Sequence, residues 1–366
     1  MFPSIGARPI EDTMYDHAPR IVIWEMTRAC ALACRHCRAE AIPRRDPLEL
    51  TTMEAFKLVD DVYACDRPVF VLTGGDPLMR DDIYEIVEYG TSLNIPMSVS
   101  PSATGRLTRA AVTRLATAGV RRISLSLDAP DAQAHDAFRG VVGSFKRTVE
   151  GIGYALDCGI GVQINTTVAQ HNRLRLLEFE EVLGPFGIAL WSLFFVLPVG
   201  RAAEDMCLTA DQTEAAFGDI YSIASRAAFD VKATEAPHYR RFAIQHSSDI
   251  RAAGRAVRPG SRERFAGIGD GRGFVFVSHH GDIQPSGFLP LPVGNVREQN
   301  LLDVYRDHPI MQRLREPHAF DGKCGACEYN VICGGSRARA YAASRNPFGS
   351  DASCEHIPAA YARHVP

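Results

Sequence analysis

Hydrophobic residues along this chain of 366 residues gather in six short runs that are rich in β-branched side chains. Most of the runs are apolar without strict alternation, which is typical of parallel strands covered on both faces. Segments with helical patterns lie between them, and one opens with the capping pair Thr51 and Glu54. The runs cover residues 20–27, 68–74, 95–102, 121–128, 161–168 and 190–198.

Six repeats of strand and helix predict an α/β fold, in which a parallel sheet curves into a partial (β/α)6 barrel of the TIM type. A full eight-unit barrel needs two more units, and the pattern does not supply them. Beyond the barrel we expect a helix at 209–228, a mobile loop at 247–273 and a hairpin at 274–285 that turns at His280-Gly281-Asp282. The predicted parts are an N-terminal arm (1–19), the barrel (20–200), a helical connector with a mobile loop (201–272) and a small C-terminal domain (273–366).

Composition narrows the class of partner. The 40 Lys and Arg residues nearly balance the 43 Asp and Glu residues, so no nucleic-acid or membrane partner is expected. The most apolar segment, 188–199, is too short to span a bilayer. Ten cysteines, mostly at metal-like spacings and without a secretory signal, indicate a reduced cytoplasmic location. Cys65, Cys158 and Cys207 stand alone and are expected to be inert.

Polar residues and glycines stand at the ends of the predicted strands. A cysteine-rich loop follows the first strand, and Gly74, Gly75 and Asp76 follow the second. In parallel barrels the active site is built from such positions at the carboxyl ends of the strands. The sequence therefore predicts one site at this mouth, to which later strands add Ser100, Ser102, Ser126, Asp128 and Asn165.

The cysteine-rich loop reads Cys30-x3-Cys34-x2-Cys37. Three thiols do not close a tetrahedral zinc site, which normally takes four protein ligands. They suit an iron–sulfur cluster in which one iron stays open for another ligand. This spacing is the signature of the radical S-adenosylmethionine (radical SAM) enzymes, and the chain resembles that superfamily. The residue before the last cysteine is usually aromatic there, and here it is His36.

The resemblance implies that Cys30, Cys34 and Cys37 hold a [4Fe-4S] cluster to which SAM binds. Gly74-Gly75-Asp76-Pro77 resembles the family's Gly-Gly-Glu-Pro element, which receives the SAM amino group. Ser126 and Arg139 match the family's carboxylate contacts, and Arg suits this role because it grips a carboxylate through two hydrogen bonds. An electron from an external flavodoxin- or ferredoxin-type donor then yields a 5′-deoxyadenosyl radical that abstracts hydrogen from the substrate. Further SAM contacts are expected from Ser100, Ser102 and Asn165, while no general acid or base is identified.

A second group of thiols consists of Cys324, Cys327, Cys333 and Cys354. Four thiolates satisfy either a zinc ion or a four-iron cluster. Beside a radical SAM loop the pattern resembles the SPASM and twitch extensions, which implies one auxiliary [4Fe-4S] cluster. The hairpin carries no cysteine for a second one, and Arg337 stands where the longer pattern has another cysteine.

Three stretches, 285–290, 294–297 and 333–341, resemble the alternative haem and haem d1 biosynthesis branch of the superfamily. That resemblance implies cleavage or oxidative decarboxylation of a tetrapyrrole side chain. Tyr239, Arg240 and Arg241 are then candidate anchors for its carboxylates, or else an ordinary basic face.

Two alternatives stay open. Peptide maturases share the architecture, although the 29 residues before Cys30 are too few for the leader-binding domain that many of them carry. The substrate is therefore a small molecule or a peptide. The other alternative is a non-catalytic iron–sulfur or zinc protein.

Overall fold

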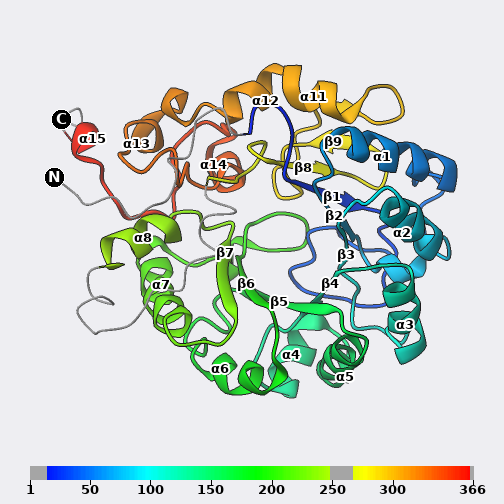
Figure 1. Cartoon of the computed structure of the whole chain (residues 1–366). Helices are drawn as coiled ribbons and strands as arrows, with labels where there is room; N and C mark the ends of the chain where they lie inside the picture. The colour runs from blue at the N-terminus through cyan, green and yellow to red at the C-terminus, as the bar shows by residue number, and fades with distance from the viewer. Residues whose placement is uncertain (1–14, 248–266, 363–366) are drawn as a thin grey trace.

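The computed structural model describes residues 15–247 and 267–362. Within them the strands form one ten-stranded sheet in the order β10-β9-β8-β1-β2-β3-β4-β5-β6-β7, which curves with helices around its outer side (Figure 1). The strands are β1 (Ile21–Glu25), β2 (Val69–Thr73), β3 (Met97–Val99), β4 (Arg122–Ser126), β5 (Gly161–Val168), β6 (Leu190–Phe195), β7 (Asp230–Thr234), β8 (Phe274–Val277), β9 (Asp282–Gln284) and β10 (Gly294–Asn295).

The predicted partial barrel is confirmed, but it contains more parallel strands than the sequence pattern indicated. β7 adds in parallel to β6, and β8 adds in parallel to β1, so β8 and β1 to β7 make eight parallel strands. No pairing among the described residues joins β7 to β8, so the barrel is open. The sequence pattern did not assign β7 and β8 to the barrel, because strand pairing between segments as distant as Ile21 and Phe274 leaves no local signal.

Helices cover the outer face of the sheet. α1 begins with the predicted capping box, in which the Thr51 side chain accepts from the Glu54 N–H. The helices are α1 (Thr52–Ala64), α2 (Ile83–Ser92), α3 (Arg109–Thr117), α4 (Ala132–Arg139), α5 (Ser144–Asp157), α6 (Glu178–Leu183), α7 (Ala210–Ala224), α8 (Tyr239–Gln245), α11 (Leu301–Asp307), α12 (Pro309–Leu314), α13 (Gly322–Gly325), α14 (Arg337–Ser344) and α15 (Ala359–Ala362).

The main hydrophobic core lies between the sheet and these helices. Trp24 of β1 stacks on Phe70 of β2, and both side chains are fully buried. The inner face is more polar, because burial alternates along β5 and leaves Gln163, Asn165 and Thr167 partly exposed. The outer face of the barrel is therefore packed against helices by hydrophobic side chains, whereas its inner face is polar and opens at the strand ends.

The C-terminal part begins with the predicted hairpin, since β8 and β9 pair in antiparallel fashion and Gly281 takes a left-handed conformation (φ 87°) in the turn. Most of the predicted mobile loop and most of the N-terminal arm lie outside the described residues. In Figure 1, α13, α14 and α15 lie beyond β7 and α8, on the side where the sheet is open.

Candidate active site

The predicted cysteine loop lies directly after β1, at the mouth of the barrel. Cys30 and Cys34 are buried, and Cys37 is half-buried. The Cys30 sulfur accepts from the Leu32 N–H at 3.3 Å and the Cys37 sulfur from the Ala41 N–H at 3.4 Å. Backbone N–H groups that point at sulfur stabilise thiolate ligands of an iron–sulfur cluster. This donor set, three clustered thiols with N–H donors on two of them, fits the cluster that the sequence implies.

Gly74 and Gly75 are glycines because the backbone before the cysteine loop passes directly over them. A Cβ atom on Gly74 would lie 2.3 Å from the carbonyl oxygen of Thr27, and one on Gly75 would lie 2.5 Å from that of Ala29. The Gly75 N–H donates to Thr27 O, and the Asp76 N–H donates to Ala29 O, both at 2.7 Å. The glycine pair therefore sets the height of the cysteine loop above the second strand.

Asp76 is fully buried, and its carboxylate is used within the protein. One oxygen accepts from Thr104 Oγ1 at 2.7 Å, and the other accepts from the N–H groups of Leu78 and Ser102. Burial raises the pKa of the Asp76 carboxyl, although these donors oppose the shift. Asp76 thus connects the loops that follow β2 and β3.

The four other predicted SAM contacts lie at or near the ends of β3, β4 and β5, near the mouth. Ser102 Oγ donates to Gly75 O at 2.7 Å and lies 3.6 Å from Cys30 Sγ, which joins the third strand end to the cysteine loop. Ser126 of β4 pairs in register with Asn165 of β5, and both are half-buried. Ser100 Oγ donates more weakly to Ser124 O at 3.4 Å. The structure therefore brings these serines and Asn165 to one end of the barrel.

Arg139, the predicted carboxylate ligand, is anchored by a residue that was not among the predicted ligands. Its Nε donates to the buried Asp128 carboxylate at 2.6 Å, and its Nη1 lies 3.8 Å from Cys34 Sγ. Burial would raise the pKa of the Asp128 carboxyl, but Arg139 and nearby groups hold it well below its usual range. Asp128 thus stays charged and aims the guanidinium at the cysteine loop. The sequence signal for Asp128 was its position shortly after β4, at the end of a predicted strand.

His36 stands at the position where the radical SAM pattern usually has an aromatic residue, and its ring packs as an aromatic side chain would. Its ring stacks on Phe138 at 4.3 Å and 6°, and Phe138 stacks on His171 at 3.9 Å. Burial lowers the pKa of His36 to about 3, so the ring is neutral at pH 7. The neutral imidazole therefore fills the aromatic position and holds the cysteine loop against α4.

The four C-terminal cysteines line a single small cavity. It is bounded by Cys324, Cys327, Cys333 and Cys354, together with neighbours that include Gly335. A Cβ atom on Gly335 would lie 2.9 Å from Cys324 Sγ, so only glycine leaves this space open. The chain brings all four predicted ligands to one place, as a closed four-thiolate centre requires.

Hydrogen-bond donors surround these sulfurs as well. Cys324 Sγ accepts from Asp351 N–H at 3.3 Å and from Arg337 Nη2 at 3.4 Å, and the Cys327 and Cys333 sulfurs each accept from a backbone N–H at 3.4 Å. Burial raises the pKa of Cys327 to about 11 and that of Cys333 to about 12. Neutral thiols are therefore favoured until a metal displaces their protons. Arg337, which stands where the longer pattern has a cysteine, donates a hydrogen bond to a cysteine sulfur instead of supplying one.

The candidate substrate anchors of α8 are used within the protein. Arg240 donates to the carbonyl oxygens of Ile332 and Ile268, both at 2.9 Å. Arg241 is buried and pairs with Glu214, and Tyr239 packs against Phe217. Because these side chains already have partners within the protein, they have few hydrogen-bond donors left for a substrate carboxylate. The same contacts mean that this part of α8 is not an ordinary solvated basic face.

Comparison with known proteins places this geometry in a family. The model of the radical SAM superfamily matches residues 24–174. Over 360 residues the chain is 38% identical to the AdoMet-dependent heme synthase of Oleidesulfovibrio alaskensis, covering 96% of this chain and 92% of that protein. It is 28% identical over 365 residues to the mycofactocin maturase MftC of Mycobacterium tuberculosis, covering 95% and 87% respectively.

Among solved structures, the fold resembles that of Streptococcus suis SuiB bound to S-adenosylmethionine, with a TM-score of 0.71 and 17% identity over 93% of this chain and 78% of that one. None of the helices in the described part of the chain has the length and apolar character to span a bilayer. From the family match and the heme synthase relative together, the chain belongs to the radical SAM superfamily and is a radical SAM enzyme related to the AdoMet-dependent heme synthases.

Proposed function

We propose that this enzyme acts on a propionate side chain of an iron tetrapyrrole, by oxidative decarboxylation or side-chain cleavage. The observation that carries the proposal is the 38% identity with a protein named a heme synthase, which extends over 96% of the chain. A match over this share of the chain spans the barrel and most of the C-terminal part.

In this proposal Cys30, Cys34 and Cys37 hold the SAM-binding cluster. The backbone of Gly74, Gly75 and Asp76 binds the amino group of SAM, Arg139 and Ser126 bind its carboxylate, and Ser100, Ser102 and Asn165 contact its nucleoside. Once bound, the cluster and SAM supply a 5′-deoxyadenosyl radical. The chain orients the substrate C–H bond at the polar inner face and excludes water there.

The four C-terminal cysteines hold an auxiliary [4Fe-4S] cluster in this proposal. Removing a hydrogen atom and carbon dioxide from a propionate leaves a vinyl group and one surplus electron. A redox-active group is needed to accept that electron, and this is the chemistry that the auxiliary cluster would supply. A zinc ion at the same thiols has no accessible redox change.

Two exposed arginines beside the cysteine loop replace Arg240 and Arg241 as candidate propionate anchors. Arg35 lies in the loop, where its N–H donates to Phe138 O, and the Arg201 N–H donates to Cys37 O at 3.1 Å. Both side chains are exposed, so each can form charge-assisted hydrogen bonds with a carboxylate.

The test is anaerobic turnover with SAM and a reductant, either dithionite or a reduced flavodoxin or ferredoxin. Iron-coproporphyrin should give 5′-deoxyadenosine, carbon dioxide and a porphyrin of lower mass. Arg201→Ala should weaken kcat/KM, while Arg121→Ala, exposed at the opposite end of β4, should not. Production of 5′-deoxyadenosine with no change in any porphyrin would refute the substrate but leave the radical chemistry standing.

Peptide maturation is the second candidate, because the mycofactocin maturase is 28% identical along nearly the whole chain. Candidate precursor peptides belong in the same assay, and a peptide of altered mass would favour this function. Family membership makes the chain an enzyme, so the non-catalytic alternative is set aside.

A further inference from the structure

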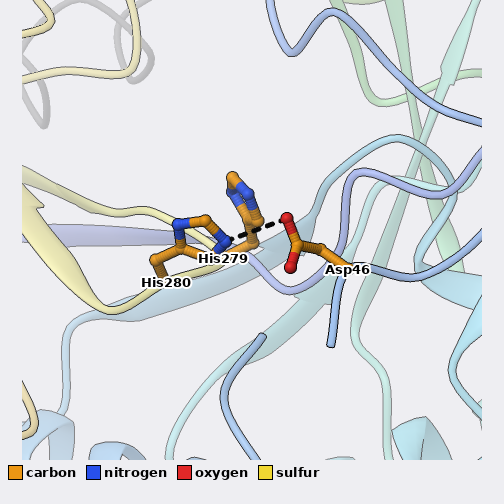
Figure 2. A group of neighbouring side chains, drawn as sticks. All are labelled: Asp46, His279 and His280. Atoms are coloured by element: carbon orange, nitrogen blue, oxygen red, sulfur yellow. Dashed lines mark ion pairs between the residues drawn. The ribbon is translucent and has the colours of Figure 1, made fainter. Parts of the chain in front are cut away.

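Two histidines and an aspartate meet beside the mouth of the barrel, apart from both groups of cysteines. Asp46 lies between the cysteine loop and α1, and His279 and His280 lie in the turn of the β8–β9 hairpin (Figure 2). One ligand atom from each side chain lies within 4.8 Å of the other two. His280 Nε2 and Asp46 Oδ2 are 3.1 Å apart.

His279 has the surroundings of a metal ligand. Its Nδ1 lies 2.9 Å from Glu25 Oε1, and Glu25 also pairs with Arg38. Its Nε2 is buried and has no hydrogen-bond partner, and the residue as a whole is only 7% exposed. Metal-ligating histidines commonly donate their second ring N–H to a carboxylate, which fixes the tautomer and leaves the other nitrogen for the metal. A buried imidazole nitrogen without a partner is otherwise costly.

We propose that Asp46, His279 and His280 bind a divalent transition-metal ion of the Zn²⁺ class, with Glu25 as the positioning residue behind His279. Imidazole nitrogens and a carboxylate oxygen suit such an ion. Three protein ligands leave a coordination position for water or another small ligand. Asp46 and His280 are partly exposed, with side-chain exposures of 26% and 35%, so an ion can enter from solvent.

The ion would join two segments that are distant in sequence. The segment that follows the cysteine loop already touches the hairpin, since Leu50 N–H donates to His279 O at 2.9 Å. Arg297 adds a second connection, because it donates to His280 O and to Leu48 O. A metal ion at this junction would hold the hairpin against the segment that follows the cysteine loop. Its binding would raise the stability of the folded state.

The test uses enzyme with both iron–sulfur clusters reconstituted, so that the seven predicted cluster cysteines are occupied. Anaerobic dialysis against zinc sulfate, then passage over a chelating resin, should leave one zinc per chain by elemental analysis. X-ray absorption at the zinc edge should show only nitrogen and oxygen neighbours, because zinc–sulfur distances of about 2.3 Å mark cysteine ligation. Sulfur in the shell, or no zinc above trace levels in the wild type, would overturn the proposal.

Variants then assign the ligands. His280→Gln and Asp46→Asn should each weaken zinc affinity at least about tenfold in competition with a chromophoric chelator, and should abolish the zinc-induced rise in Tm. Glu25→Gln should weaken it by about 10- to 100-fold, as loss of a hydrogen-bonded partner behind a ligand does. His17→Gln, an exposed histidine elsewhere, should match the wild type. Equal zinc affinity in the wild type and the ligand variants would refute the assignment. A variant that misfolds leaves the wild-type stoichiometry and spectrum to decide.

Discussion

The two groups of cysteines differ in what surrounds them. The N-terminal loop lies on the rim of the barrel, where glycines, serines and Arg139 from neighbouring strand ends converge on it. The C-terminal four thiols close on one another around a small cavity. A centre with three thiols and polar groups at its open side is arranged to bind a ligand, whereas four thiols in a closed cavity are arranged to hold a group in place.

The charges near the sulfurs differ in the same way. Arg139 approaches Cys34 but is held by the buried Asp128, so its orientation depends on an ion pair at the end of β4. Arg337 donates to Cys324 and otherwise to the carbonyl oxygens of Gly335, Pro347 and Gly349. The first arginine keeps a charged group available near the mouth, and the second is part of the cavity wall. The comparison predicts that mutations in the two centres have different effects on activity.

Replacing one cysteine of the loop should have the largest effect. Cys34→Ser should reduce 5′-deoxyadenosine formation to the level without enzyme, because the cluster that binds SAM loses a ligand. Iron should fall from about eight to about four atoms per chain, the content of one [4Fe-4S] cluster. Iron analysis and chromatography of the nucleoside after anaerobic reduction measure both. Cleavage of SAM at wild-type rate by this variant would show that the loop is not the site.

Replacing one cysteine of the cavity should give the opposite pattern. Cys327→Ser should also lose about four irons, yet it should keep forming 5′-deoxyadenosine while losing most substrate conversion. The same two assays, with product analysis, separate the centres. If Cys327→Ser abolished SAM cleavage while its circular dichroism stayed native, the division of roles between the two regions would be wrong.

The sequence predicted candidate ligands in both regions more readily than the contacts around them. The thiol spacings and apolar runs identified the cysteines and six strands, since these signals are local. The pairing of β8 with β1 and the ion pair of Asp128 with Arg139 are contacts between distant segments, and no local pattern reports them. The hydrogen bonds of the Asp76 carboxylate with Thr104 and Ser102 likewise join segments that are distant in sequence, so only the fold reveals them.

The ion pair at the mouth should make a large contribution to stability. Asp128→Asn leaves the guanidinium of Arg139 without its buried counter-charge and should cost about 3–5 kcal/mol in the free energy of unfolding. The lowered pKa of Asp128 means that its contribution is present above about pH 4 and is lost as the pH falls further. Urea unfolding of cluster-free protein at pH 7 should show the full difference, which should narrow in acid.

A matched control uses a pair of the same type on the surface. Asp157→Asn removes the partner of Arg109, in a pair whose side chains are 57% and 60% exposed, and should cost less than about 1 kcal/mol. If Asp128→Asn were no more costly than Asp157→Asn at pH 7, Asp128 would not be the buried anchor described here.

The glycine pair should show a smaller, steric effect. A methyl group on Gly75 would lie 2.5 Å from Ala29 O and 2.6 Å from Arg28 O, so Gly75→Ala should cost about 2 kcal/mol and displace the cysteine loop. SAM cleavage should fall together with stability. Gly153→Ala in α5 meets no atom within 4 Å and should be neutral or stabilising by up to about 1 kcal/mol. Chemical denaturation compares the two, and equal stabilities would contradict the close approach.

The smallest expected effect concerns protons at the closed cavity. Burial raises the pKa of Cys327 to about 11 and of Cys333 to about 12, above the ordinary 9.0. The unfolded chain therefore releases these protons first, so the stability of metal-free protein is fully present well below pH 9 and declines as the pH rises from there toward these values. Between pH 8.5 and 9.5 the loss should be about 1 kcal/mol for the two thiols together. Removing both thiols in the Cys327→Ser, Cys333→Ser double variant should remove this part of the slope, while other buried cysteines with a raised pKa, such as Cys65, keep theirs. Filling the site with its cluster should remove the same part, because ligated thiolates carry no proton to lose. Urea unfolding under argon across this range measures the slope, and a double variant with the same slope as the wild type would assign the protons to other groups.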